Sequence, residues 1–267
     1  MKKIVLLFFA SVALCMAYID SDIDGVEDAY DKCPQTPFSD LVDYSGCSIN
    51  SSTKEFHFDI IFGMGFSQTN YTLQESADTI STFVQSDFYM DNVVLQAVIS
   101  RYHSDTQDGS GWDDATLSLF YKLPTTETFS LNLLTALIFP TYKSPYGNEA
   151  LDYRVGFDFS YFADEKNYLF GGYNYTFVND SDFGYVSYQN TQTFYIGIAH
   201  KPNSDKSYTL SYTADESIYR DITAIQILGI GYSLDINRHW FMGAYYDYGL
   251  SDSAGKHSFS LSIGYFF

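Results

Sequence analysis

The stretch Ser258-Phe-Ser-Leu-Ser-Ile-Gly-Tyr-Phe-Phe267 decides the fold class of this chain. Apolar side chains occupy every second position, and small polar or glycine residues occupy the positions between them. A hydrophobic period of two residues predicts a β-strand with one apolar face and one polar face. The apolar face carries Phe259, Leu261, Ile263, Tyr265 and Phe267, and the other face carries Ser258, Ser260, Ser262 and Gly264.

The same alternation recurs upstream, in units separated by breaks. Between Leu151 and Tyr161 apolar and aromatic residues alternate with charged or small ones, and between Phe56 and Phe66 they do so again. Each unit has about ten residues, the length that a tilted strand needs to cross a bilayer. An open sheet would leave backbone groups unpaired in hydrocarbon, so the sheet must close on itself. We therefore predict an all-β, antiparallel, up-and-down transmembrane β-barrel of about twelve strands over residues 54–267.

The breaks between these units alternate between short and long. Asp91-Asn92 and the segments 124–127, 163–167, 202–206 and 235–238 are short, whereas 67–79, 104–113, 140–150, 179–190, 215–221 and 250–256 are mostly longer. Short periplasmic turns and longer outer loops alternate in this way in bacterial barrels. An even strand count then leaves both termini in the periplasm.

Aromatic residues near the breaks are expected to form the two belts at the membrane surfaces. The periplasmic belt is predicted from Tyr121, Tyr168, Tyr208 and Trp240, and the outer belt from Tyr175, Phe177, Tyr212, Tyr246 and Tyr248.

Composition excludes several classes of protein. The 25 tyrosines and 23 phenylalanines favour strands, and a mean hydropathy of −0.13 without a long apolar run downstream of the first residues excludes an α-helical membrane protein. The net charge of −19 argues against nucleic-acid binding. No Gly-x-Ser-x-Gly motif, zinc-ligand spacing or phosphate-binding loop is present, so we do not expect an enzyme.

Residues 1–17 have the pattern of a secretory signal peptide. Lys2 and Lys3 precede the apolar run from Ile4 to Leu14, and small residues precede Tyr18. After cleavage two cysteines, Cys33 and Cys47, would remain, and an even pair in an oxidising compartment predicts one disulfide.

An acidic loop directly follows this leader. Its oxygen donors stand at positions 1, 3, 5, 9 and 12, with Gly25 at position 6 and the carbonyl of Val26 at position 7. This spacing can wrap one chain around a Ca²⁺ ion, which prefers six to eight oxygen ligands. The predicted ligands are Asp20, Asp22, Asp24, Val26, Asp28 and Asp31.

The segment Asp20–Cys47 resembles a thrombospondin type 3 repeat, through its spaced aspartates, Cys33-Pro34-x-Thr36-Pro37 and Gly46-Cys47. The resemblance implies that these aspartates bind calcium and that Cys33 and Cys47 pair. Ser39 departs from the glycine common in the family, and only one repeat is present. We assign residues 18–50 to this repeat and expect it in the periplasm of the cell.

The last strand resembles the carboxy-terminal signal of bacterial outer-membrane barrels of the porin type, which ends in an aromatic residue. The resemblance implies that Phe259, Leu261, Ile263, Tyr265 and Phe267 are read by the barrel-insertion machinery. It places the chain in the outer membrane, in contact with its lipids and lipopolysaccharide, and we expect a monomer.

The polar face of the barrel is predicted to line a narrow lumen. Acidic residues outnumber basic ones there, so a pore would favour cations. We expect a passive channel for small solutes; the alternative is a structural or adhesive surface protein without a conducting pore. The candidate lumen residues are Asp59, Asp87, Lys122, Asp152, Arg154 and Asp158.

Overall fold

The structure is a computed structural model, and it describes most of the chain from His57 onward. The described residues are 57–69, 77–105, 109–126, 128–142, 150–182, 184–203 and 205–267, with Asp22, Val26, 31–33, Thr36, Val42 and 46–48. The leader expected at residues 1–17 lies outside them. Within the described residues, no helix has the length and apolar character to span a bilayer.

The described chain is built from strands. They are β1 (His57–Thr69), β2 (Ala77–Met90), β3 (Val93–Ser104), β4 (Ser110–Trp112), β5 (Ala115–Thr126), β6 (Phe129–Phe139), β7 (Asp152–Phe162), β8 (Asn167–Phe177), β9 (Thr191–Asn203), β10 (Lys206–Asp215), β11 (Ile225–Asp235), β12 (Trp240–Gly249) and β13 (His257–Phe266).

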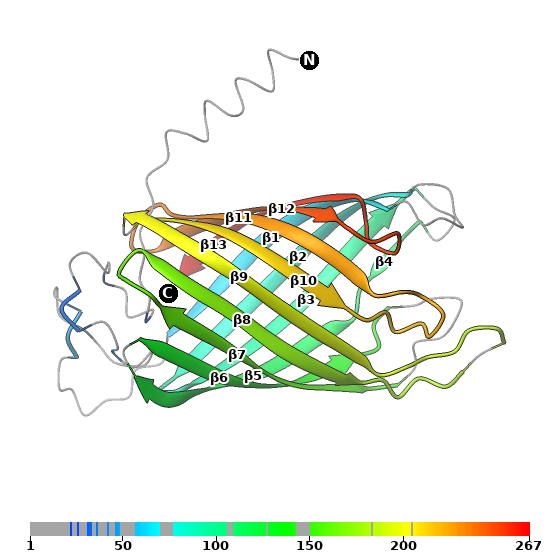
Figure 1. Ribbon diagram of the computed structural model, residues 1–267, viewed down its shortest axis with the longest axis horizontal. Coiled ribbons are helices and arrows are strands. Elements are labelled where there is room, and N and C mark those ends of the chain that lie inside the picture. Colours follow the sequence, from blue (N-terminus) through cyan, green and yellow to red (C-terminus); the bar gives the residue numbers. More distant parts are fainter. Residues whose placement is uncertain are drawn as a thin grey trace, which may run out of the picture.

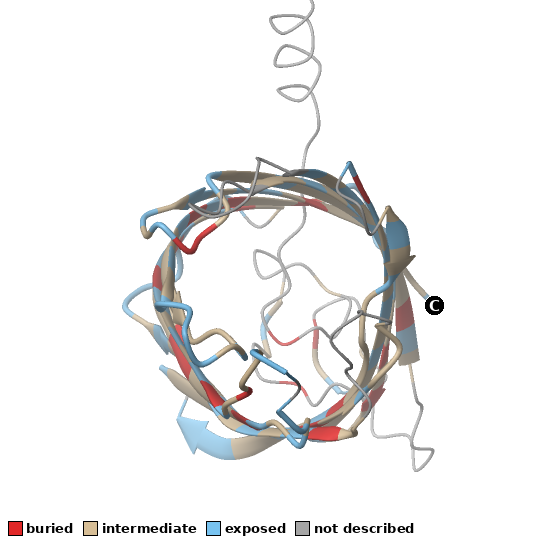
Figure 2. Cartoon of the chain, turned by 90° about the vertical axis from the view of Figure 1, so that its right-hand side faces the viewer, coloured by how far each residue is buried: buried red, intermediate tan, exposed pale blue. Residues whose placement is uncertain are grey.

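These strands form one closed antiparallel sheet (Figure 1). Except at β4, each strand pairs with its neighbours in sequence, and β13 returns to pair with β1. The three-residue β4 pairs with the end of β3, whose other half pairs with β5, so β4 and β5 occupy one position in the ring. The predicted all-β barrel of 12 strands is confirmed, and the view along its axis shows the strands as a closed ring (Figure 2).

The strand boundaries differ from the prediction at two prolines. Pro124 and Pro202 were expected in breaks, but they lie inside β5 and β9. The pairing of β5 with β6 shifts register between Leu123 and Thr126, and the pairing of β9 with β10 shifts near Asn203. A proline has no N–H for the ladder, so it is tolerated where the pairing is irregular.

The outer face of the barrel is apolar. Ile198, Leu210 and Ile230 are register neighbours on β9, β10 and β11, and their side chains are 57%, 45% and 54% exposed. Phe259 and Ile263 on β13, and Phe267 directly after it, are exposed in the same way. This continuous apolar surface is the face that a lipid bilayer would cover.

Most of the predicted belt residues face outward, with one clear exception. Tyr121, Tyr208 and Trp240 are exposed near the short turns, and Phe177, Tyr246 and Tyr248 are exposed near the long connections. Tyr168 was expected in the periplasmic belt, but it pairs with Phe162 and lines a cavity on the inner wall. The prediction for Tyr168 is therefore wrong.

Two of the short turns are shaped by aspartates. Asp91 has a φ of 48° in the two-residue connection between β2 and β3, a conformation that asparagine and aspartate tolerate in tight hairpins. In the turn after β7, Asp164 accepts hydrogen bonds from the backbone and side chain of Asn167, and these bonds lower the pKa of its carboxyl.

Candidate functional site

The inner wall of the barrel is the candidate site, because the polar face of every strand meets there. On β10–β13 and β1 many inward positions carry small residues, and these lie side by side across the ladder. Gly65 pairs with Ser260, Ser260 with Tyr245, and Tyr245 with Gly231. The hydroxyl-bearing members of this surface are Ser67, Ser207, Thr209, Ser211, Thr213, Ser233, Ser258, Ser260 and Ser262.

Inward aromatic rings lie flat against the wall because glycines stand beside them. A Cβ atom added at Gly63 would lie 2.1 Å from the ring of Phe83, its partner on β2, so the ring covers the space that a side chain would fill. Such aromatic cover of glycines is a known device of curved sheets. These rings therefore lie along the wall, over the glycines, instead of pointing toward the barrel axis. The same arrangement recurs at Gly197 with Phe170 and at Gly264 with Phe241.

Asp59 and Asp87 lie directly opposite each other on β1 and β2. Their side chains are only 2% and 5% exposed, so both carboxyls are buried against the wall. The hydroxyl of Tyr89 donates a hydrogen bond of 2.9 Å to Oδ2 of Asp59, and the amide of Gln85 donates one of 2.7 Å to Oδ2 of Asp87. Polar partners on the same face therefore hold both predicted lumen acids in place.

Arg154 and Asp152 lie on β7 near the long connections. Nε of Arg154 donates a hydrogen bond of 3.1 Å to Thr176 on β8, and the guanidinium interacts electrostatically with Asp215 and Asp152. Asp152 also accepts a hydrogen bond of 2.7 Å from the backbone of Asn179. Arg154 is therefore balanced by neighbouring acids inside the barrel, where its charge is not exposed to lipid.

Asp158 lies further along β7, also on the inner face. It is separated from Tyr195 by Gly172, which stands between them in the register of β7, β8 and β9. Because glycine leaves space, the hydroxyl of Tyr195 reaches across and donates a short hydrogen bond to Oδ1 of Asp158. Tyr195 was not identified from the sequence, although its alternation with Phe194 and Ile196 indicates an inward position.

Lys122 lies at the end of β5 that leads into a short turn. Its ammonium interacts electrostatically with the carboxylate of Asp22, which belongs to the segment before β1 and is 2% exposed. In Figure 1 the described parts of this segment (blue) lie at the end of the barrel with the short turns. A charged contact therefore joins the amino-terminal segment to the mouth of the lumen.

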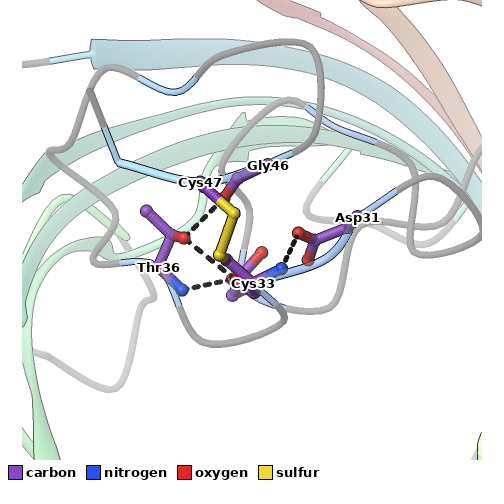
Figure 3. Close-up of a disulfide and its surroundings, with 6 residues drawn as sticks. Asp31, Cys33, Thr36, Gly46 and Cys47 are labelled. Carbon is purple, nitrogen blue, oxygen red and sulfur yellow. Dashed lines mark hydrogen bonds between the residues drawn. A yellow bond between two sulfur atoms is a disulfide. The ribbon is translucent and has the colours of Figure 1, made fainter.

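The amino-terminal segment is cross-linked by a disulfide between Cys33 and Cys47, with a Cα–Cα distance of 5.0 Å. Thr36 links the chain after Cys33 to the chain before Cys47. Its hydroxyl donates a hydrogen bond of 2.7 Å to the carbonyl of Gly46 (Figure 3). The backbone of Thr36 also donates one of 2.5 Å to Oδ2 of Asp22. The structure thus forms the predicted bridge and brings Asp22 next to it.

The predicted calcium ligands are only partly visible. Asp20, Asp24 and Asp28 lie outside the described residues, whereas Asp22, Val26 and Asp31 lie within them. Among the residues that can be placed, no three acidic, histidine or cysteine side chains form a metal cluster. Oδ1 of Asp31 accepts a hydrogen bond of 2.7 Å from the backbone of Cys33, so this carboxylate takes part in shaping the turn. The donors that are visible are carboxylate oxygens, the chemistry that Ca²⁺ requires.

Two solved structures show which class of fold this barrel belongs to. An outer membrane channel from Pseudomonas putida F1 matches with a TM-score of 0.61 and 14% sequence identity, over 79% of this chain and 94% of that one. The NanC porin matches with a TM-score of 0.53 and 10% identity, over 78% of this chain and 98% of that one. The chain therefore has the fold of a bacterial outer-membrane β-barrel of the porin type.

No protein-family model matches the chain, and no curated protein matches it in sequence. The resemblance of Asp20–Cys47 to a thrombospondin type 3 repeat accordingly rests on its own motif. The two structural neighbours are described as a channel and a porin.

Proposed function

We propose that this protein is a passive outer-membrane channel that admits small solutes and prefers cations, with a calcium-binding segment at its periplasmic mouth. The observation that carries this proposal is the chemistry of the inner wall. Small hydroxyl-bearing side chains cover one part of it, and the aromatic rings lie against glycines. The fold shared with a channel and a porin supports the same conclusion.

The preference for cations follows from the charges on the inner face. Among the described inward residues, the acids outnumber the bases, and Arg154 is flanked by two of the acids. A lumen with excess negative charge concentrates cations and repels anions. The acids include Asp59, Asp87, Asp152, Asp158, Asp215 and Asp247, and the bases include Lys122, Arg154 and Lys201, whose ammonium lies 5.5 Å from the ring of Tyr168.

The amino-terminal segment narrows one mouth in this proposal. Asp22 is held by Thr36 and interacts with Lys122 at the rim, so the cross-linked loops stand beside the opening. Calcium would order the acidic loop by neutralising its carboxylates, which otherwise repel each other within a short segment. The residues that would hold the ion are Asp20, Asp22, Asp24, Val26, Asp28 and Asp31.

A planar-bilayer recording of the refolded full-length protein tests the channel. We expect discrete conductance steps and a reversal potential under a KCl gradient that shows K⁺ passing more readily than Cl⁻. The Asp152→Asn variant should reduce this preference several-fold, because one charge near a hydrated ion contributes on the order of 1 kcal/mol in water. Asp164→Asn, which removes an exposed carboxylate in a short turn, is the matched control and should leave the preference unchanged. A folded barrel that never conducts would reject the channel and favour a structural or adhesive surface role.

Calorimetric titration of the folded full-length protein with Ca²⁺ tests the segment. We expect one weak site, with a dissociation constant on the order of 10⁻⁴–10⁻³ M, as in extracellular calcium modules. Asp24→Ala should weaken this binding at least about tenfold, since it removes a central ligand of the loop. Asp252→Ala, in the connection after β12, should not change it. The calcium site is rejected if the heat of binding is the same with and without Asp24.

A further inference from the structure

A cavity of about 420 Å³ opens on the inner wall between β7 and β12. It is lined by Asp158 together with residues that the sequence did not single out. Its size is within the range of small-molecule sites in proteins. Side chains of three chemical kinds meet in it, namely carboxylates, aromatic rings and hydroxyls. Those used in the argument below are Asp158, Phe170, Tyr195, Ser211, Tyr245 and Asp247.

The two carboxylates of the cavity are held in position by hydroxyl groups. Tyr195 donates its hydrogen bond to Oδ1 of Asp158, and Ser258 on β13 donates one of 3.3 Å to Oδ2 of Asp247. Among the described residues that line the cavity, no lysine, arginine or histidine is present to balance them. The cavity therefore has a net negative charge, and its carboxylates do not have a basic partner on the cavity wall.

Glycines make the floor of the cavity flat. A Cβ atom at Gly229 would lie 2.7 Å from Oδ1 of Asp247 and 2.8 Å from Oγ of Ser211, and one at Gly231 would lie 2.2 Å from the hydroxyl of Thr209. A side chain at Gly229 would cover the carboxylate of Asp247 and the hydroxyl of Ser211, and one at Gly231 would cover the hydroxyl of Thr209 and the ring of Tyr245. Glycines on a strand often mark a place where a ligand approaches the backbone closely. The polar groups of the wall thus stay accessible to a small molecule in the lumen.

We propose that this cavity binds a small organic amine that carries one or two ammonium groups. An ammonium ion can pair with Asp158 or with Asp247, because both carboxylates line the cavity, and a diamine brings a second positive charge to the same negatively charged space. The rings of Phe170, Tyr195 and Tyr245 would cover the methylene groups and attract the cation by their π faces. An anionic solute would be repelled by the two carboxylates. A neutral polyol would bind more weakly than an amine, because it forms no ion pair with them. This inference rests on the proposed channel, since the amine would be a solute that passes through it.

The test is binding of putrescine to the full-length barrel, refolded in detergent and measured by calorimetry. The diol of the same chain length is the matched ligand, because it has the same carbon skeleton without charge. We expect putrescine to bind and the diol to fail. The Asp247→Asn substitution should weaken putrescine binding at least about tenfold, because it removes one charged contact. The control is Asp215→Asn, which removes a lumen acid outside the cavity. It should change the dissociation constant of putrescine by less than about twofold if the amine is bound by the cavity and not by the overall negative charge of the lumen.

Three results would overturn the amine site. The first is that the diol binds as tightly as putrescine. The second is that Asp215→Asn weakens putrescine binding as much as Asp247→Asn does. The third is that a barrel that conducts does not bind putrescine. Each variant is first checked for the shift in gel migration between unboiled and boiled samples that a folded barrel gives. Should Asp247→Asn fail this check, Asp158→Asn takes its place with the same expectation. A barrel that binds putrescine but never conducts keeps the site and rejects the channel, so the two proposals can fail separately.

Discussion

Replacing Ile198 by arginine (Ile198→Arg) is expected to lower the free energy of unfolding of the barrel by about 2–4 kcal/mol, the cost of an arginine at the middle of a bilayer. Ile198 lies near the middle of β9, and its side chain is among the most exposed on the outer face. Its register partners Leu210 and Leu169 are both apolar, so neither can receive the new charge. The measurement is a chemical denaturation curve of the protein refolded in lipid vesicles.

The matched control for this experiment is Ser260→Arg on β13. Ser260 lies opposite Gly65 and Tyr245 on the inner face, where water can solvate a guanidinium. We expect this variant to lose much less stability than Ile198→Arg. Equal losses in the two variants would mean that the apolar face does not contact lipid, and the membrane-spanning assignment would then be wrong.

Removing the disulfide is expected to destabilise the amino-terminal segment by about 3 kcal/mol, the value for closing a loop of about fifteen residues. Cys33 and Cys47 are separated by 14 positions, and the hydroxyl of Thr36 lies within hydrogen-bond distance of the carbonyls of Cys33 and Gly46, at the two ends of the loop that the bridge closes. The Cys33→Ser/Cys47→Ser double variant should be cut by protease within this segment much faster than the parent protein. Limited proteolysis of the membrane-embedded protein, followed by mass spectrometry of the fragments, measures the change.

The barrel supplies the internal control for the disulfide variant. The gel shift on boiling should be the same in the variant and the parent, because the cysteines lie outside all strands of the sheet. Loss of the gel shift would show instead that the bridge is needed to fold the barrel. Equal rates of cleavage in both proteins would show that the bridge does not stabilise the segment.

The sequence predicts the closed barrel well because its signal is local. On β13 each apolar residue has a polar neighbour, and closure of the sheet follows from the need to pair every backbone group in lipid. The three residues of β4 were missed, because Ser110-Gly-Trp112 is too short to show alternation. Its pairing with β3 depends on the course of the connection before β5, which no local pattern reveals.

The wrong orientation of Tyr168 has a similar cause. In Asn167–Phe177 apolar and aromatic residues stand at adjacent positions, so the alternation of β8 does not fix which face turns inward. Pairing with β7 decides it, because Asp158 and Ser160 face inward and their partners Gly172 and Phe170 do the same. Tyr168 lies two positions before Phe170 on the same strand, so its side chain also faces inward.

The candidate site shows the same limit of local patterns. Alternation places Asp158 on the inner face, but the contact with Tyr195 requires the register of three strands and the absence of a side chain at Gly172. Likewise, the cavity brings together residues from β7 to β12, which no spacing in the sequence relates. Sequence patterns predict the face of the sheet on which a side chain lies. Its partners on neighbouring strands depend on the strand order and on the register of pairing, which the pattern does not contain.

The seam between β1 and β13 has a consequence for biogenesis. Ten successive residues of β1, from Asp59 to Gln68, pair with β13 from Phe266 back to His257, so the earliest strand is completed only by the latest one made. Until that moment two edges of the growing sheet have unsatisfied amides and carbonyls, which hydrocarbon does not tolerate. A ribosome-bound chain therefore has no intermediate that is stable in the bilayer. Insertion of a closed barrel therefore has to follow the synthesis of β13.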